Sequence, residues 1–313
     1  MRFKGLDLNL LVTLDCLLSE RNVSRAADKL CLSQSATSGA LTRLREYFND
    51  ELLVQLGRGM VMTPRAAELL PAVRNVLLQV EGTIIKRPDF DPLTAKREIR
   101  IVASDYMVIA ALADTLRALK KKAPDLTFTL ISPGEDPRGM LERGEVEFLA
   151  MPDVYLSPDH PSVHLFSDDY RAVVWTGNEQ VTGDSVTLSE FLKMRHVTVN
   201  YTLTGPSFEG WFIERFGNDR LVEVSTSSYS TVPFLIVGTQ RIALMHHRLA
   251  DAFARMMPLK LVKPPVEIPQ IHETLQWHVY NDSDECLIWL RAQFIELIAV
   301  HLRQPAALAE TQP

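Results

Sequence analysis

The chain has 313 residues, enough for two or three domains of ordinary size. Its 46% hydrophobic and 23% charged residues exclude bulk disorder and collagen-like structure. The formal net charge is −6, but residues 1–65 hold 9 Lys or Arg against 7 Asp or Glu, whereas the remainder holds 24 against 32. This asymmetry favours a small nucleic-acid-binding module at the N-terminus of an acidic body.

The cysteines and the apolar segments point to a cytoplasmic protein. The 3 cysteines, Cys16, Cys31 and Cys286, have spacings that fit neither a disulfide framework nor a CxxC metal site. Asp7 and Asn9 interrupt the apolar residues near the N-terminus, so we expect no signal peptide. Longer apolar stretches are broken by charged side chains, so we expect neither a transmembrane helix nor a membrane partner.

Residues 6–48 are expected to form three helices. Leucines at helical spacing predict a first helix to Glu20, and Ser24 and Ser33 are placed to cap a second and a third helix. The third helix, over 34–48, is expected to bury Ala36, Ala40, Leu41, Leu44 and Phe48. Its outward residues are expected to be Gln34, Ser35, Thr37, Ser38, Thr42, Arg43 and Arg45.

A hairpin and a long helix are expected next. Short apolar runs on both sides of 57–59 predict a β-hairpin with Arg58 at its tip, and three helices with a hairpin make a winged helix-turn-helix over 1–63. Thr63 and Pro64 are typical of a helix start. A helix over 64–85 that pairs with a second copy is predicted by an apolar seam at spacings near 3.5, formed by Leu69, Val73, Val76, Val80 and Ile84. Pro71 is expected to bend this helix without ending it. The alternative is that the helix only packs within its own domain.

The rest of the chain is expected to be α/β. Residues 86–98 contain two prolines and no periodicity, so they are expected to form a hinge. Strands and helices then alternate, which predicts a parallel, doubly wound sheet. The expected elements at its start are strands over 98–103, 126–131 and 146–151 and helices over 106–122 and 137–143. Residues 304–313 are expected to be a frayed tail.

The third helix is the expected DNA-reading element. A helix of this kind fits the major groove, where Gln34 can pair with adenine or a phosphate and small neighbours permit close approach. The arginines are expected to hold phosphates, which give affinity but no direct sequence information. The candidate DNA-binding residues are Ser33, Gln34, Ser35, Thr37, Ser38, Thr42, Arg43, Arg45 and Arg58. The alternative is that they are solvated polar groups of a surface helix.

Ligand-binding residues are expected where strands end, because the crevice at the carboxyl ends of strands is the usual site in open α/β sheets. Ser104, Ser132 and Met151 follow or end the first three expected strands, and further candidates follow strands expected over 196–199, 221–224 and 242–245. The candidates are Ser104, Tyr106, Ser132, Met151, Tyr201, Thr202, Ser225, Thr226 and His246. Each serine or threonine could instead be only a helix cap.

Enzyme signatures are absent from the sequence. GxSxG, GxGxxG, a P-loop lysine and HExxH do not occur, and Gly57-Arg58-Gly59 lacks a third glycine. His246 and His247 are adjacent, so on a strand they would point to opposite faces rather than hold one metal ion. We therefore expect no catalytic residue, cofactor or metal.

Several motifs together resemble the LysR-type transcriptional regulators, and within them the NodD/NahR branch. In the N-terminal part they are Leu6-Asp7-Leu8-Asn9-Leu10-Leu11, Ala26-Ala27, Leu32-Ser33-Gln34, Arg43-Leu44-Arg45 and Thr63-Pro64. Later ones include Phe90-Asp91-Pro92-Leu93-Thr94, Pro206-Ser207-Phe208-Glu209-Gly210-Trp211 and Gly238-Thr239-Gln240-Arg241-Ile242-Ala243. Many family members have proline at the position of Ser35 and arginine near Gln55, so Arg58 is expected to replace the wing contact.

The resemblance implies an α+β multidomain chain with a two-lobed effector domain of periplasmic-binding-protein type over 99–303. Lobe I would comprise 99–168 and 271–303, and lobe II 169–270. It also implies a homodimer through the helix 64–85, often a homotetramer. The regulator would bind promoter DNA, respond to a small and possibly aromatic inducer between the lobes, and act as an activator with RNA polymerase as a possible partner. The alternatives are an architectural DNA-binding protein without a small-molecule response and an α/β enzyme.

Overall fold

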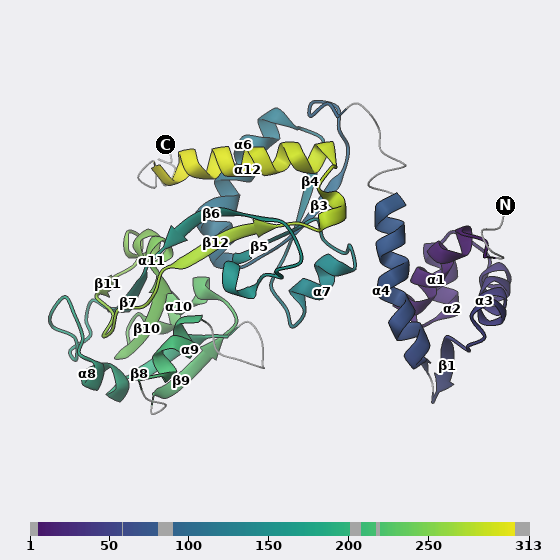
Figure 1. Cartoon of the computed structure of the whole chain (residues 1–313). Coiled ribbons are helices and arrows are strands. Elements are labelled where there is room, and N and C mark those ends of the chain that lie inside the picture. The colour runs from purple at the N-terminus through teal and green to yellow at the C-terminus, as the bar shows by residue number, and fades with distance from the viewer. Residues whose placement is uncertain (1–5, 58, 81–89, 201–207, 217–219, 304–313) are drawn as a thin grey trace. The chain divides into compact units, whose positions relative to one another are not determined.

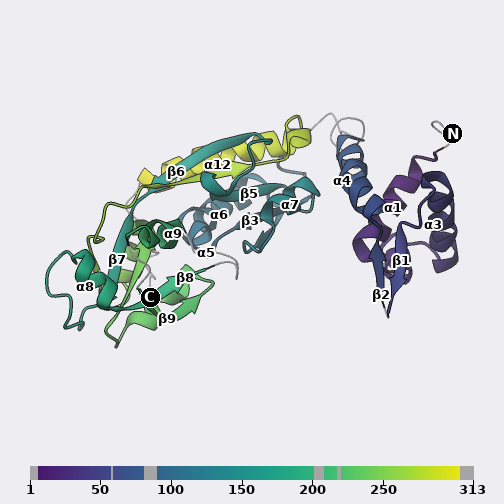
Figure 2. The same ribbon diagram turned by 60° about the horizontal axis from the view of Figure 1, so that its bottom comes forward.

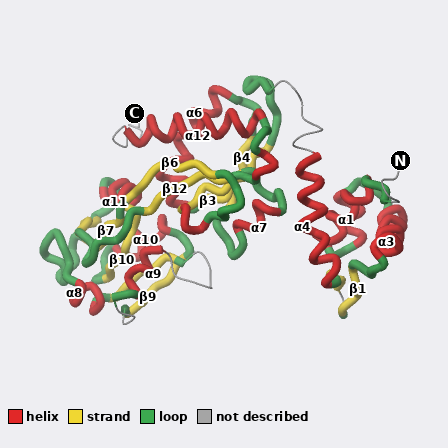
Figure 3. The backbone as a smooth tube through the Cα atoms, in the orientation of Figure 1, coloured by secondary structure: helices red, strands yellow, loops and turns green. Residues whose placement is uncertain are grey.

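The structure is a computed structural model that describes residues 6–57, 59–80, 90–200, 208–216 and 220–303 (Figure 1). The chain divides into two compact units. The first is helical apart from one hairpin, and the second contains both five-stranded sheets (Figure 3). Among the described residues, no helix is long and apolar enough to cross a membrane.

The first unit is a winged helix-turn-helix, as predicted. Its elements are α1 (Asn9–Glu20), α2 (Val23–Lys29), α3 (Gln34–Phe48), β1 (Leu53–Leu56), β2 (Gly59–Met62) and α4 (Pro64–Gln79). Strands β1 and β2 pair antiparallel and extend from the helices (Figure 2). Leu14, Leu17 and Leu44 are fully buried in a core shared by α1, α3 and α4. The leucine spacing of the first helix therefore serves this core.

The helix starts are set mostly by the predicted caps. The Ser33 hydroxyl accepts the N–H of Ala36 at 3.1 Å, and the Thr63 hydroxyl accepts that of Ala66 at 3.1 Å. The predicted cap Ser24 is wrong, because the Asn22 side chain accepts the N–H of Arg25 at 3.0 Å and α2 starts two residues earlier. Helix α4 passes through Pro71 without ending, as predicted, and the expected continuation over 81–85 lies outside the described residues.

The second unit contains two lobes, each built on one sheet. Lobe I has the strand order β4-β3-β5-β12-β6, with β3 (Glu98–Ala103), β4 (Thr127–Ile131), β5 (Phe148–Pro152), β6 (Ser162–Asp168) and β12 (Ile271–Gln276). Lobe II has the order β11-β7-β10-β8-β9, with β7 (Tyr170–Trp175), β8 (Arg195–Val199), β9 (Leu221–Thr226), β10 (Arg241–His246) and β11 (Leu259–Val262). The chain crosses between the lobes after β6 and again before β12.

Helices cover both sheets. Lobe I carries α5 (Asp105–Met107), which continues through a π-helical turn into α6 (Ala113–Lys122), and also α7 (Pro137–Glu142) and α12 (Glu285–Arg303). Lobe II carries α8 (Leu188–Lys193), α9 (Phe208–Glu214), α10 (Val232–Ile236) and α11 (His247–Ala254). Helices α6 and α12 lie side by side along lobe I (Figures 1 and 2). The single helix expected over 106–122 is thus interrupted near its start.

The predicted all-parallel sheet is wrong, since both sheets are mixed. Strand β3 is parallel to β4 and β5, but β12 is antiparallel to β5 and β6, and β7 is antiparallel to β10 and β11. Only Asp169 separates β6 from β7, and these strands belong to different sheets. Strand β6 leads out of lobe I and β12 leads back into it, while β7 leads into lobe II and β11 leads out of it. The paired strands β6 and β12, and β7 and β11, therefore run in opposite directions.

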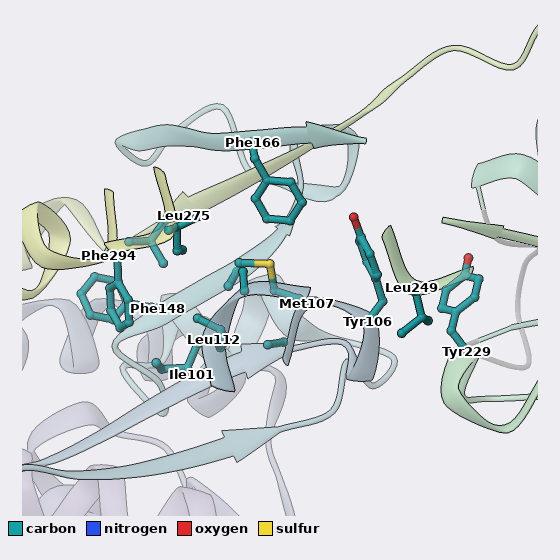
Figure 4. Close-up of a cluster of buried hydrophobic side chains, with 14 of the residues drawn as sticks. Ile101, Tyr106, Met107, Leu112, Phe148, Phe166, Tyr229, Leu249, Leu275 and Phe294 are labelled. Carbon is teal, nitrogen blue, oxygen red and sulfur yellow. The ribbon is translucent and has the colours of Figure 1, made fainter. Parts of the chain in front are cut away.

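One hydrophobic core runs through both lobes. In lobe I it includes Ile101, Phe148 and Phe294, and in lobe II it includes Met245 and Leu249. Figure 4 shows part of this cluster, with Tyr106 and Tyr229 on either side of Leu249. Because the buried surface is continuous, the lobes pack on each other as well as being joined by two chain crossings.

Candidate DNA-binding face and effector cavity

Helix α3 presents a polar face to solvent. Gln34, Ser35, Ser38, Thr42 and Arg43 are all exposed. Positions 34, 38 and 42 are four residues apart, which places them on one side of the helix. The residues lie in the first two turns and the middle of α3, where a recognition helix reaches base edges. Five of the predicted DNA-binding side chains are therefore available together.

Two residues that were expected on this outward face have structural contacts instead. Thr37 is fully buried, and its hydroxyl donates to the Ser33 carbonyl at 3.1 Å, so its predicted exposure is wrong. Ala36 is exposed in its place. The Arg45 guanidinium donates to the carbonyls of Glu51 and Leu53 at 2.8 and 2.7 Å. It ties the end of α3 to the hairpin, which leaves it poorly placed to hold a phosphate.

The hairpin strands pair up to Leu56 and Gly59. Gly57, after the end of β1, adopts a φ of +61° that suits glycine. The predicted phosphate contact Arg58 lies outside the described residues. Gln55 is exposed on β1. A wing with exposed polar side chains is consistent with contact to a DNA backbone.

The apolar residues of helix α4 lie in two environments, the core of the first unit and the solvent-exposed surface. Val73 is buried in the first unit's core, and Leu69 packs against that core. Val76 is exposed, with 44% of its surface accessible. The part of the predicted seam formed by Leu69 and Val73 thus packs within the domain, while Val76 remains available to another surface.

A cavity lies between the two lobes at the carboxyl ends of β3, β5 and β10. The cavity volume is about 50 Å³, within a wider space of about 430 Å³ that includes open solvent. Three predicted ligand-binding residues, Ser104, Met151 and His246, line it together. The remaining lining residues are Pro133, Ala150, Pro152, Tyr155, Phe208, Glu209, Tyr229, Ile271 and Glu273.

The other ligand-binding candidates are placed differently. Tyr106 is buried beside the cavity, with its ring 3.9 Å from that of His246. Ser132 is exposed and does not line the cavity. Strand β9 extends two residues further than expected, so Ser225 and Thr226 lie within it, and Ser225 lines a separate pocket inside lobe II. Tyr201 and Thr202 lie outside the described residues.

His246 is held as a neutral ring at the centre of an aromatic group. The rings of Tyr106, Tyr170 and Tyr229 lie 3.9, 4.9 and 4.5 Å from it between centroids. Burial lowers the pKa of His246 to about 3, because a charged imidazole would lose its hydration there. Nδ1 has no hydrogen-bond partner among the described residues. A ligand in the cavity would meet an uncharged imidazole.

Buried carboxyl groups are the main feature that the sequence did not reveal. Glu209 and Glu273 are 4% and 1% exposed, and both line the cavity. Glu209 accepts the Tyr229 hydroxyl at 2.8 Å, while Oε2 of Glu273 has no hydrogen-bond partner among the described residues. The sequence offers one signal of this site: Glu273 lies between Ile271 and Leu275 on the same face of a strand, where an apolar residue would be expected.

A hydrogen-bonded carboxylate also connects the lobes behind the cavity. Asp168 ends β6 and accepts the Tyr106 hydroxyl at 2.7 Å and the N–H of Arg248 in α11 at 3.1 Å. Burial raises the pKa of Asp168 despite these hydrogen bonds. The tyrosine belongs to lobe I and the arginine to lobe II, so Asp168 holds the two lobes at the first chain crossing.

Asp105 forms a second connection beside the cavity. From the first turn of α5, its Oδ2 accepts the Ser228 hydroxyl at 2.7 Å and the N–H of Ser230 at 2.6 Å, both from lobe II. Burial alone would raise the pKa of Asp105, but these hydrogen bonds hold it below its usual value. We call Asp105, Ser228 and Ser230 the interlobe clasp. Ser104, which precedes Asp105, both lines the cavity and caps α5.

Two protein-family profiles match the sequence of this chain. The profile described as "Bacterial regulatory helix-turn-helix protein, lysR family" matches residues 8–67, and "LysR substrate binding domain" matches residues 94–294. The chain belongs to the LysR family of transcriptional regulators. The two profiles cover the winged helix-turn-helix and the two-lobed unit that holds the cavity. They confirm the predicted family and fold, and the prediction that the protein is a transcriptional regulator rather than an enzyme.

Similar LysR-family proteins extend over almost the whole chain. Nodulation protein D 1 of Mesorhizobium japonicum is 41% identical over 93% of each chain, and nodulation protein D 3 of Rhizobium meliloti is 40% identical over the same shares. These relatives support the predicted NodD-like branch.

Solved structures have the same fold. A probable transcriptional regulator of Pseudomonas aeruginosa, 30% identical, matches with a TM-score of 0.64 over 94% of this chain and 98% of its own. A full-length OxyR variant from P. aeruginosa, 15% identical, matches with a TM-score of 0.73 over 98% and 99%. CbnR bound to its target DNA is 14% identical, with a TM-score of 0.59 over 94% and 99%.

Proposed function

We propose that this LysR-family regulator binds promoter DNA through the exposed face of α3 and responds to a small molecule in the cavity between the lobes. The observation that carries the proposal is the combination of a solvent-facing polar recognition helix with a cavity that both lobes line. A ligand that contacts both lobes favours one lobe arrangement over others, and such differential binding can control DNA binding.

The aromatic lining favours an aromatic ligand. Tyr155, Phe208 and Tyr229 line the cavity, and the ring of His246 completes one wall. Flat rings pack well against such side chains, with a gain of about 0.5–1.5 kcal/mol per pair beyond area burial. A flavonoid or a smaller phenolic compound is the inducer class we propose.

DNA binding by this mode requires two copies. One winged helix-turn-helix makes few phosphate contacts, so pairing through the helix over 64–85 on a two-fold operator is the expected route to useful affinity. Val76 is one exposed apolar residue of α4 that such pairing would cover. We propose a homodimer that assembles into a homotetramer, acts in the cytoplasm as an activator, and contacts RNA polymerase at the promoter.

The first test measures binding of the full chain to DNA from beside its own gene and to unrelated DNA, over a salt series and with phenolic compounds added. Preferred binding with a steep salt slope and a ligand-dependent change supports the proposal. Preferred binding that no compound alters would favour an architectural DNA-binding protein. Equal binding to both DNAs would contradict sequence-specific regulation.

Replacing both Gln34 and Ser38 with alanine should reduce the preference for operator over unrelated DNA by about ten- to a thousand-fold, since each base-edge contact contributes about 1–3 kcal/mol of discrimination. Binding to unrelated DNA should change little. The matched control is Glu46→Ala, an exposed position of the same helix. An unchanged preference in the double variant would exclude these side chains from base readout.

Opening the interlobe clasp should destabilise the two-lobed unit. Asp105→Ala removes the carboxylate that both hydrogen bonds need, so we expect a loss of about 2 kcal/mol of unfolding free energy. Ser228→Ala removes only the bond from its own hydroxyl and should cost about half as much. Urea unfolding of the full chain measures both effects. Equal losses in the two variants would mean that the clasp does not depend on the Asp105 charge.

A further inference from the structure

Glu273 is a deeply buried carboxyl group that lines the effector cavity. It lies in the middle of β12, opposite Pro152 of β5 and Phe166 of β6, and only 1% of its surface is accessible. Its Oε2 has no hydrogen-bond partner among the described residues, and the same is true of His246 Nδ1 and the Tyr170 hydroxyl. Buried polar atoms normally have partners, so the two such atoms whose residues line the cavity, Glu273 Oε2 and His246 Nδ1, indicate a place for a bound polar group.

The groups that surround Glu273 are mostly acidic or phenolic, and Arg248 of α11 pairs with Asp168, with 3.9 Å between Nε and Oδ1. Among the described residues that line the cavity, none is lysine or arginine. The titratable groups around it come from α5, the turn after β5, β6, β7, α9 and β10, and they are Tyr106, Asp153, Tyr155, Asp168, Tyr170, Glu209 and His246. His246 is neutral, and the rest are acidic or phenolic groups.

Such surroundings oppose ionisation of the carboxyl group. Burial, then repulsion by Asp168 and Asp153, raises the pKa of Glu273 to about 8. A neutral carboxyl group has one O–H donor, whereas the ionised form only accepts hydrogen bonds. Below that pH, the cavity floor therefore offers a donor to a ligand.

We propose that Glu273 is a specificity-determining residue: as a neutral acid it donates a hydrogen bond to an acceptor oxygen of an uncharged ligand, and the cavity rejects ligands that carry a carboxylate. This inference rests on the proposed function of the cavity and adds the charge of the ligand. A carboxylate there would lose its hydration without gaining a cation, which is strongly unfavourable. Rejection of this kind gives specificity against compounds of the same shape.

A pair of compounds of similar shape and different charge tests the proposal. Methyl benzoate has ester oxygens that only accept hydrogen bonds, and benzoate differs by carrying a full negative charge. Ligand-observed NMR with the full chain at pH 6.5 measures both. We expect methyl benzoate to bind at least ten-fold more tightly than benzoate.

Two variants of Glu273 separate the donor from the shape of the side chain. Glu273→Gln keeps an N–H donor and should retain methyl benzoate binding within about three-fold, while Glu273→Ala should weaken it ten-fold or more. The matched control, Glu179→Gln, makes the same chemical change at an exposed glutamate. It should leave the affinities for methyl benzoate and benzoate unchanged. Equal retention in the alanine variant would overturn the donor role.

The pH dependence gives a readout that a purely structural role would not produce. Between pH 6.5 and 9.5 the unaltered chain should lose methyl benzoate affinity as Glu273 ionises, and Glu273→Gln should not. Benzoate binding as tight as that of the ester would overturn the inference while leaving ligand binding in the cavity intact. Binding of neither compound, with operator binding retained, would overturn both the inference and the assigned cavity, but not the DNA-binding role.

Discussion

Glu273→Gln should unfold at a higher temperature than the unaltered chain at pH 8, and the two should unfold at nearly the same temperature at pH 4. The reason is the environment of the carboxyl group, which burial and the neighbouring acids keep protonated in the folded state. The glutamine side chain is close in shape and carries no titratable proton. Scanning calorimetry of the full chain, following the transition of the two-lobed unit, measures the difference.

The sign follows from the two states of Glu273. Its pKa is about 8 when folded and has the ordinary value of 4.5 when unfolded. Between these values the unfolded chain has released a proton that the folded chain keeps, so stability falls by about 1.4 kcal/mol for each pH unit of increase. Below pH 4.5 both states are protonated and the cost disappears. Above pH 8 both are ionised and the cost stops growing, at several kcal/mol in favour of the variant.

The control for this prediction is Glu179→Gln, which lies on the surface and should follow the unaltered chain at every pH. A constant offset between Glu273→Gln and the unaltered chain would mean that packing, rather than ionisation, distinguishes them. A variant that is less stable at pH 8 would show that Glu273 is ionised and satisfied in the folded protein, which would also undermine its role as a donor.

The DNA-binding unit was largely predictable because its signals are local. Ser33 and Thr63 cap the helices that follow them, and the short apolar runs on both sides of 57–59 pair as β1 and β2. The errors on α3 have two causes. Thr37 is spaced three, four and seven residues before the buried Ala40, Leu41 and Leu44, so the helical period places it on the inner face, and its polar side chain was the reason for the wrong assignment. Its hydroxyl is satisfied locally by donating to the Ser33 carbonyl. The Arg45 guanidinium donates to a backbone carbonyl of the hairpin, and the periodicity of a helix cannot predict a contact with another element.

The effector cavity was predictable in location but not in chemistry. The rule about carboxyl ends of strands brought Ser104, Met151 and His246 together. Glu273 lies in the middle of a strand rather than at its end, and its burial depends on the register of β12 between β5 and β6 and on lobe II above it. The Asp105 contacts to Ser228 and Ser230 join residues more than 120 positions apart. The spacing of residues in the sequence cannot predict contacts between residues so far apart.

Replacing Arg74 with methionine should destabilise the winged helix-turn-helix and weaken operator binding. Arg74 in α4 is 7% exposed, and its Nε donates to Asp15 Oδ1 of α1 at 2.7 Å while a second nitrogen donates to the Ser19 hydroxyl at 2.7 Å. Breaking a buried pair by removing one partner costs about 3–5 kcal/mol. Because about a third of the Asp15 side chain remains exposed, we expect a loss near the lower limit.

Two further variants identify the cause of that loss. Arg65→Met removes the exposed ion pair with Glu68 on the same helix and should cost under about 1 kcal/mol. The double variant Arg74→Met with Asp15→Leu removes both charges, and should recover much of the stability because the unpaired carboxylate is gone. In Arg74→Met the loss of stability, measured by chemical unfolding, and the loss of operator affinity, measured by titration, should occur together. The ion pair fixes α4 against α1, and this holds the recognition helix in place relative to the helix that we propose pairs two copies. A double variant as unstable as Arg74→Met would mean that the arginine acts through packing of its stem rather than through the ion pair.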